Sequence, residues 1–67
     1  MKIRLNNNSE VIDQEKLTVS RLLEIRNFTF KMLIVKINGH LVKKSEYATT
    51  EIKEGDDVMV LHLISGG

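Results

Sequence analysis

The sequence contains no cysteine, which excludes disulfides, thiolate metal sites and cysteine nucleophiles. The sequence also has no large excess of either charge, because ten Lys and Arg residues are balanced by nine Asp and Glu residues. A net charge of +1 indicates neither a nucleic-acid nor a membrane partner. No apolar run approaches membrane-spanning length, and the alternating start MKIRLNNN is not typical of a signal peptide. We therefore expect a cytoplasmic protein.

The length of 67 residues allows one domain, whose core is just large enough to offset the conformational entropy of the chain. Apolar residues make up 42% of the sequence and charged residues 28%, which is typical of a globular domain. We predict that residues 1–67 form a single folded domain held by packing alone.

The first six residues alternate apolar side chains with basic or polar ones, a period of two that predicts a half-buried strand with Ile3 and Leu5 on its inner face. The turn-forming segment NNNSE follows. Residues 10–13 predict a short second strand, which pairs back on the first as a hairpin.

A short helix is predicted next, because Val19, Leu22 and Leu23 recur at three- and four-residue spacing. Thr18 precedes this run and is expected to cap the helix. The helix should last two to three turns, and Asn27 is expected to end it.

Residues 28–37 are rich in aromatic and β-branched side chains and predict a strand, and Asn38-Gly39 is typical of a tight hairpin to a return strand that begins at Leu41. The stretch KKSEYATTE follows neither period, so we expect a loop from which Tyr47 packs on the core.

Gly55 lies in the turn segment KEGDDV, which leads into a last strand over residues 58–64. The order ββαβββ, with a single helix, predicts the α+β class and a β-grasp architecture: a mixed sheet of about five strands wrapped on one helix. Since one short helix covers only one face of such a sheet, the other face should stay bare.

The last strand shows which side chains occupy that bare face. Val58 and Val60 share a parity and should face the helix, so the intervening side chains point the other way. The apolar residues expected on the bare face are Ile34, Met59, Leu61 and Leu63, and the basic residues around them are Lys2, Arg4 and Lys36. An exposed apolar strip with a basic rim is typical of a protein-binding surface. Two alternatives remain open: a loop covers the strip, or the strand is buried on both faces.

No catalytic or metal site is expected. His40 and His62 are isolated imidazoles, whereas a metal site needs several convergent ligands. The neighbouring Asp56 and Asp57 lie in a turn, and a solvated turn is favoured over a catalytic carboxylate pair. The serines lie in no nucleophile motif, and no glycine-rich phosphate loop occurs.

Gly66 and Gly67 end the sequence directly after its most apolar segment. Glycines have no Cβ and fit a narrow channel in an extended form, while the preceding strand anchors them to a rigid body. A carboxylate is a poor electrophile, but ATP can activate it as an acyl-adenylate that a sulfur or nitrogen nucleophile attacks. The sequence therefore predicts a tail that is a substrate for another enzyme. The alternative is a frayed end without a role.

The chain resembles the ubiquitin-like sulfur carriers, most closely the ThiS type of thiamine biosynthesis. The resemblance rests on the opening MKIRLNN, the helix LTVSRLLE, and the succession of ING, LV, SEY, EGD, an apolar strand and the terminal GG. It implies that the carboxylate of Gly67 is adenylated by an E1-like adenylyltransferase with ATP and Mg²⁺. Sulfur from a cysteine desulfurase or another donor then forms a thiocarboxylate, which thiazole synthase consumes.

The same resemblance implies a carrier that is a protein substrate and not an enzyme, binds no cofactor itself, and is monomeric when free. Gly66 is the other half of the tail motif, and the partner-binding residues are expected in the last strand and tail: Met59, Leu61, Leu63, Ile64 and Ser65.

Four other functions stay open. The small subunit of molybdopterin synthase is similar but usually longer, often with a proline-containing segment before its glycines, and this sequence has no proline. A carrier for tRNA thiolation would use the same chemistry. A ubiquitin-like modifier would join Gly67 to a lysine amine, and a plain interaction module would use only the bare face.

Overall fold

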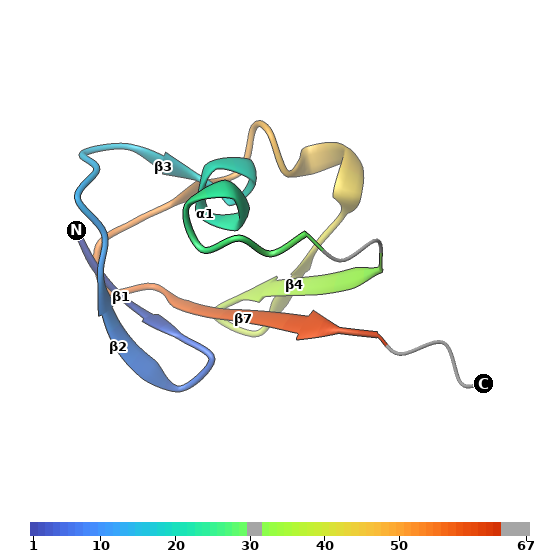
Figure 1. Cartoon of the computed structure of the whole chain (residues 1–67), viewed down its shortest axis with the longest axis horizontal. Helices are drawn as coiled ribbons and strands as arrows, with labels where there is room; N and C mark the ends of the chain where they lie inside the picture. Colours follow the sequence, from blue (N-terminus) through green and yellow to red (C-terminus); the bar gives the residue numbers. More distant parts are fainter. Residues whose placement is uncertain (30–31, 64–67) are drawn as a thin grey trace.

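The computed structural model describes residues 1–29 and 32–63 and shows one helix packed on a mixed five-stranded sheet (Figure 1). The strand order is β2-β1-β7-β4-β5. The strands are β1 (Lys2–Leu5), β2 (Asn8–Val11), β4 (Leu33–Ile37), β5 (His40–Val42) and β7 (Asp57–His62). β1 and β7 run parallel in the middle, and the other neighbouring pairs are antiparallel. This arrangement confirms the predicted β-grasp fold.

A second, two-stranded ladder lies outside the main sheet and was not expected from the sequence. β3 (Leu17–Thr18) pairs antiparallel with β6 (Glu51–Ile52), and a 3₁₀ turn, η1 (Lys44–Glu46), precedes β6. The interpretation of KKSEYATTE as an irregular loop is therefore wrong in part. The ladder forms because Leu17 and Ile52 are both fully buried, while strands of two residues are too short to show a period.

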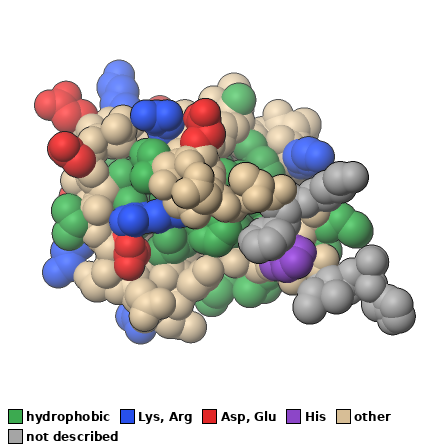
Figure 2. Space-filling model, in the orientation of Figure 1, with side chains coloured by type: hydrophobic (Ala, Val, Ile, Leu, Met, Phe, Trp, Pro, Cys, Tyr) green, Lys and Arg blue, Asp and Glu red, His purple; other side chains and the backbone are tan. Residues whose placement is uncertain are grey.

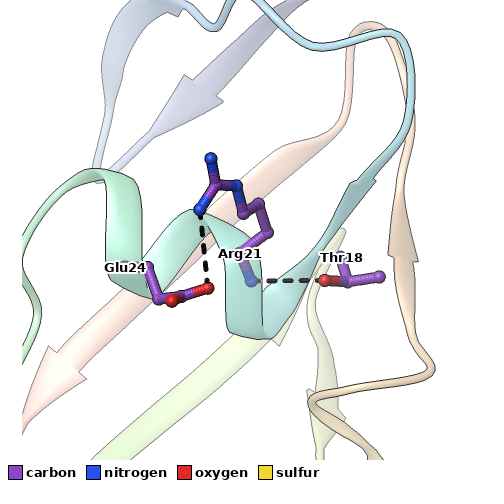
Figure 3. A network of polar contacts seen from close by, with 3 residues as sticks. All are labelled: Thr18, Arg21 and Glu24. Atoms are coloured by element: carbon purple, nitrogen blue, oxygen red, sulfur yellow. Dashed lines mark hydrogen bonds and ion pairs between the residues drawn. The ribbon is translucent and has the colours of Figure 1, made fainter.

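The helix α1 (Val19–Ile25) begins and ends as predicted. The Thr18 hydroxyl accepts a hydrogen bond from the Arg21 backbone N–H at 3.2 Å, and an exposed ion pair joins Arg21 to Glu24 at 3.7 Å (Figure 3). Such a cap satisfies one of the unpaired amides of the first turn. At the other end, Asn27 takes a left-handed conformation with φ of 56°.

The strand predicted over residues 28–37 starts later than expected. β4 begins only at Leu33, because the chain after α1 first completes the helix end: the Phe28 backbone N–H donates to the Leu23 carbonyl at 2.8 Å, and Phe28 packs against the core. Three other boundaries also differ, since the second strand is Asn8–Val11, the return strand begins at His40 and the last strand is Asp57–His62.

The core lies between α1 and one face of the main sheet and extends under the β3–β6 ladder. Its apolar side chains include both inner residues of β1 and the residues of β7 that were expected to face the helix. The buried side chains are Ile3, Leu5, Ile12, Leu17, Val19, Leu22, Val35, Val42, Ile52, Val58 and Val60. No polar or charged side chain is buried in the part of the chain that the structure describes.

Asn6 extends the pairing of β1 with β7 beyond the end of β1. Its backbone N–H donates to the Val58 carbonyl at 2.9 Å, and its side-chain Oδ1 accepts from the Val60 N–H at 2.7 Å. The chain turns away here, with φ of 49° at Asn6. The carboxamide thus replaces the carbonyl that a longer β1 would have offered to the central strand.

Replacing Asn6 by Gly is expected to lower the free energy of unfolding by about 1–3 kcal/mol, because the partly buried Val60 N–H loses its acceptor. Glycine keeps the positive φ, so backbone strain does not contribute. Asn7→Gly is the matched control: Asn7 also has a positive φ, of 68°, and its side chain has no hydrogen bond within the described residues. Urea unfolding followed by circular dichroism measures both variants, and equal losses would contradict the role of the Asn6 side chain.

Candidate functional site

The candidate site consists of the sheet face opposite α1 and the end of β7 from which the C-terminal residues continue. In this face, Ile34 pairs with Leu61, and Lys36 pairs with both Met59 and Leu41. Residues directly opposite each other in an antiparallel pair share a face. The sheet therefore brings together an apolar row, defined here as Ile34, Leu41, Met59 and Leu61.

The apolar row is open to solvent at two of its four positions. Leu61 is 43% exposed and Leu41 62%, while Ile34 and Met59 are half-buried. This confirms the expected placement of Ile34, Met59 and Leu61 on the bare face. Leu41 is an addition that sequence reasoning missed, although the Asn-Gly hairpin fixes the register that places it opposite Lys36.

Charged residues lie within and beside the apolar row. Lys36 lies between Met59 and Leu41, and Arg4 lies opposite Asp57 where β1 meets β7. A shallow hollow in this face is lined by Lys36, Gly39, Asp57, Met59 and Leu61. An exposed apolar surface with charges at its border is typical of a protein-binding site, because the apolar part supplies affinity and the charges select the partner.

Leu63 does not join this row. It lies beyond β7, its backbone N–H donates to the Met32 carbonyl at 3.0 Å, and it lines a second hollow together with Leu23, Phe28 and Tyr47. The predicted placement of Leu63 beside Leu61 is therefore wrong, because the strand ends at His62 and the alternation of faces ends with it. Leu63 is nevertheless 41% exposed, so apolar surface lies on both sides of the end of β7.

The view in Figure 2 shows how side chains are distributed on one side of the molecule. Most of the acidic side chains visible in this view lie left of the middle, and hydrophobic side chains also reach the surface on the right. The end of the molecule at which β7 ends in Figure 1 is thus the less acidic one on this side.

The C-terminal residues predicted to carry the chemistry and part of the partner contacts lie outside the described residues: Ile64, Ser65, Gly66 and Gly67. What the structure shows is the body that precedes them. β7 is the central strand, paired with β1 on one side and β4 on the other. The pairing with β1 covers Asp57 and Val58, whereas the pairing with β4 continues to His62, so the end of β7 is held by β4.

The residues considered for catalysis lie apart in the structure. His40 lies in β5 and His62 at the end of β7, both exposed. The Asp56 carboxylate accepts from the Lys53 N–H at 2.8 Å and from Asn38 Nδ2 at 3.1 Å, so it stabilises a turn. Within residues 1–29 and 32–63, no group of three or more His, Cys, Asp or Glu side chains is arranged to hold a metal ion.

No helix formed by the described residues has the length and apolar character needed to cross a membrane.

Comparison with known proteins places this arrangement in a family. Residues 2–67 match the model of the ThiS family. The chain is similar to the crystal structure of a thiamine biosynthesis protein (ThiS) from Geobacter metallireducens, with a TM-score of 0.89, 28% sequence identity and coverage of 100% of both chains. An NMR solution structure of a thiamine biosynthesis protein from the same organism gives a TM-score of 0.81 and 29% identity, covering 100% of this chain and 88% of that one.

No curated protein matches the chain. The family match nevertheless includes both terminal glycines and all the strands of the sheet, and the fold agrees with a ThiS structure over its full length. The chain belongs to the ThiS family.

Proposed function

We propose that this chain is a sulfur carrier of thiamine biosynthesis, which bears sulfur as a thiocarboxylate at Gly67. The observation that carries the proposal is the ThiS family match, which extends through the last glycine. It is supported by the similarity to structures described as thiamine biosynthesis proteins and by the Gly-Gly end that follows the central strand. In this role the chain is a protein substrate, and the enzymes that act on it provide the catalysis.

The proposed chemistry begins at the Gly67 carboxylate. An adenylating enzyme that binds ATP and Mg²⁺ joins this carboxylate to AMP and releases pyrophosphate, which converts a poor electrophile into a good one. A sulfur nucleophile attacks the acyl carbon and AMP leaves. Where a cysteine desulfurase supplies the sulfur as a persulfide, the acyl disulfide that forms is cleaved by a thiol, which is oxidised to a disulfide as the thiocarboxylate is released. The resulting thiocarboxylate then passes its sulfur to thiazole synthase. Gly66 and Gly67 suit this role because an extended glycine pair enters a narrow channel.

Docking of the carrier is proposed to involve the apolar row. An enzyme that acts on a short tail must also hold the folded body, because a fixed body raises the effective concentration of the tail at the active site. Leu61 and Met59 lie in β7, only a few residues before Gly67. The partner-binding residues are thus proposed in two groups: Met59 and Leu61 on the bare face, and Leu63, Ile64 and Ser65 at the start of the tail.

Leu61→Asp is expected to weaken binding to the activating enzyme by about tenfold or more, because a charge must then be desolvated in an apolar contact. The free energy of unfolding should change little, since Leu61 is 43% exposed. Titration calorimetry measures the affinity, and urea unfolding measures the stability.

Val11→Asp is the matched control for this experiment. Val11 is 72% exposed and lies on the same face, but at the β2 edge of the sheet, two strands away from β7. Its replacement should leave binding unchanged. Equal affinities for Leu61→Asp and the unsubstituted chain would remove the apolar row from the interface, and unfolding of Leu61→Asp would show that its side chain is needed in the core.

The proposed function is tested by incubating the chain with ATP, Mg²⁺ and an adenylating enzyme of thiamine biosynthesis. We expect exchange of labelled pyrophosphate into ATP that depends on the carrier. Larger species that contain the chain linked to lysine amines would instead support a modifier, and the absence of exchange despite binding would support a plain interaction module.

A further inference from the structure

The turn between β4 and β5 contains Asn38 followed by Gly39, both exposed and both with positive φ, of 50° and 84°. An asparagine followed by glycine is chemically labile, because the glycine has no side chain to hinder its backbone nitrogen from reaching the asparagine carboxamide. The structure places nothing within 4 Å of the position that a Gly39 Cβ would occupy, so the turn itself provides no steric cover.

The reaction available at this turn is deamidation. The Gly39 backbone nitrogen attacks Cγ of Asn38 and loses its proton, the Cγ–Nδ2 bond breaks, and ammonia leaves. Water then opens the five-membered succinimide at either carbonyl. The products are aspartate or isoaspartate at position 38, each one mass unit heavier than asparagine, and no oxidant or reductant is required.

Three hydrogen bonds keep Asn38 in a conformation that disfavours this reaction. The Asp57 backbone N–H donates to Asn38 Oδ1 at 2.9 Å, Asn38 Nδ2 donates to Asp56 Oδ1 at 3.1 Å, and the Asn38 backbone N–H donates to the Asp57 carbonyl at 2.7 Å. The carboxamide is therefore bonded through Nδ2 to the turn before β7 and through Oδ1 to the first residue of β7. Ring closure requires rotation of this side chain, which breaks both side-chain bonds.

Asp56, which accepts the hydrogen bond from Asn38 Nδ2, is itself held in place. Asp56 Oδ2 accepts from the Lys53 backbone N–H at 2.8 Å, and the Asp56 N–H donates to the Lys53 carbonyl at 3.0 Å. A carboxylate that is held by its own turn keeps Asn38 in place better than a mobile surface group would.

We propose that Asn38 is a masked deamidation site, kept unreactive by its hydrogen bonds to Asp56 and Asp57. When these hydrogen bonds open, the Asn38 carboxamide is free to react. Once formed, a carboxylate at position 38 would face Asp56 Oδ1 in place of the donor now 3.1 Å away, so the bond would be replaced by repulsion. Deamidation would therefore loosen the connection between the ends of β4 and β7, independently of the proposed carrier function.

The first test compares the full chain in native buffer and in urea at mildly alkaline pH and one temperature. Peptide mapping by mass spectrometry measures the rate at Asn38, and the asparagines at other positions serve as internal references. We expect deamidation of Asn38 to be about tenfold or more slower in the native chain, since two side-chain hydrogen bonds must open first. Equal rates in the two conditions would overturn the proposal.

The second test assigns the protection to Asp56. Asp56→Ala is expected to raise the native rate at Asn38 about fivefold or more. Asp13→Ala removes one exposed carboxylate that forms no ion pair or hydrogen bond within the described residues, and it should leave the rate unchanged. If circular dichroism shows that Asp56→Ala does not fold, Asp56→Asn takes its place, because its single oxygen can accept from Asn38 Nδ2 or from the Lys53 N–H but not from both. Its rate should lie between those of the unsubstituted chain and the chain in urea. A folded Asp56 variant with an unchanged rate would overturn the proposal.

Discussion

A chain that ends at Gly66 is expected to show no adenylation and no sulfur loading, while it still binds the activating enzyme. The reacting carboxylate moves back by one residue when Gly67 is removed, and a body docked through the apolar row cannot follow it. Misplacement of a reacting group by even about 1 Å can reduce a rate by roughly a hundredfold, and one extended residue spans roughly 3.3 Å or more. Pyrophosphate exchange measures the activity, and titration calorimetry measures the binding.

Gly67→Ala tests the space around the last residue without changing the position of the carboxylate in the sequence. The carboxylate keeps its place in the sequence, but a methyl group must enter a channel suited to glycine. We expect a decrease in the adenylation rate of up to about a hundredfold with unchanged affinity of the folded body. Normal turnover of Gly67→Ala would contradict the threading of the tail, and normal turnover of the shortened chain would contradict the assignment of Gly67.

Leu22→Ala is expected to lower the free energy of unfolding by about 2–5 kcal/mol, which is the range for leucine replaced in a packed core. Leu22 is fully buried on the inner side of α1. Alanine is the best helix former, so the loss comes from the cavity and not from the helix. A domain of this size has a total stability of roughly 3–10 kcal/mol, so a large share of the variant should be unfolded.

Arg21→Ala is the matched control in the neighbouring position. Arg21 contacts solvent and the exposed Glu24, and surface ion pairs of this kind contribute about 0–1 kcal/mol. Denaturation in urea and in heat, followed by circular dichroism, measures both variants. A loss at Leu22 no larger than that at Arg21 would show that α1 is not packed as described.

Sequence patterns with a clear period predicted the main features of the fold. The alternation of Ile3 and Leu5 with basic residues, and of Val58 and Val60 with Met59 and Leu61, is reproduced by the burial of these side chains. The period of two was enough to assign each residue to a face of the sheet, because a shift of one residue would turn the apolar side chains of a half-buried strand toward solvent. The single helix and its cap at Thr18 followed from local side-chain chemistry.

The features that were missed depend on contacts between distant parts of the chain. The β3–β6 ladder joins residues more than thirty positions apart through two-residue strands. Phe28 has the aromatic character typical of a strand, but the helix end used it for a capping hydrogen bond to Leu23. Propensity is local, and tertiary packing overrides it where the two disagree.

The candidate site, like the fold, has features that the sequence predicts and features that it does not. The bare face could be inferred from parity, and the family match agrees with the resemblance seen in the sequence, while the role of the Gly-Gly tail stays a prediction. The roles of Asn6 and Asn38 could not be inferred, because their side chains bond to groups 54 and 18–19 positions away. Both residues show only the turn preference of asparagine in the sequence.

The most direct test of the carrier function is the intact mass of the chain after incubation with ATP, Mg²⁺, an adenylating enzyme of thiamine biosynthesis, a cysteine desulfurase and cysteine. The account predicts a mass gain equal to the exchange of one oxygen for one sulfur, located at Gly67 and absent when ATP is omitted. An unchanged mass under conditions in which the adenylate forms, or sulfur found at any other position, would contradict it.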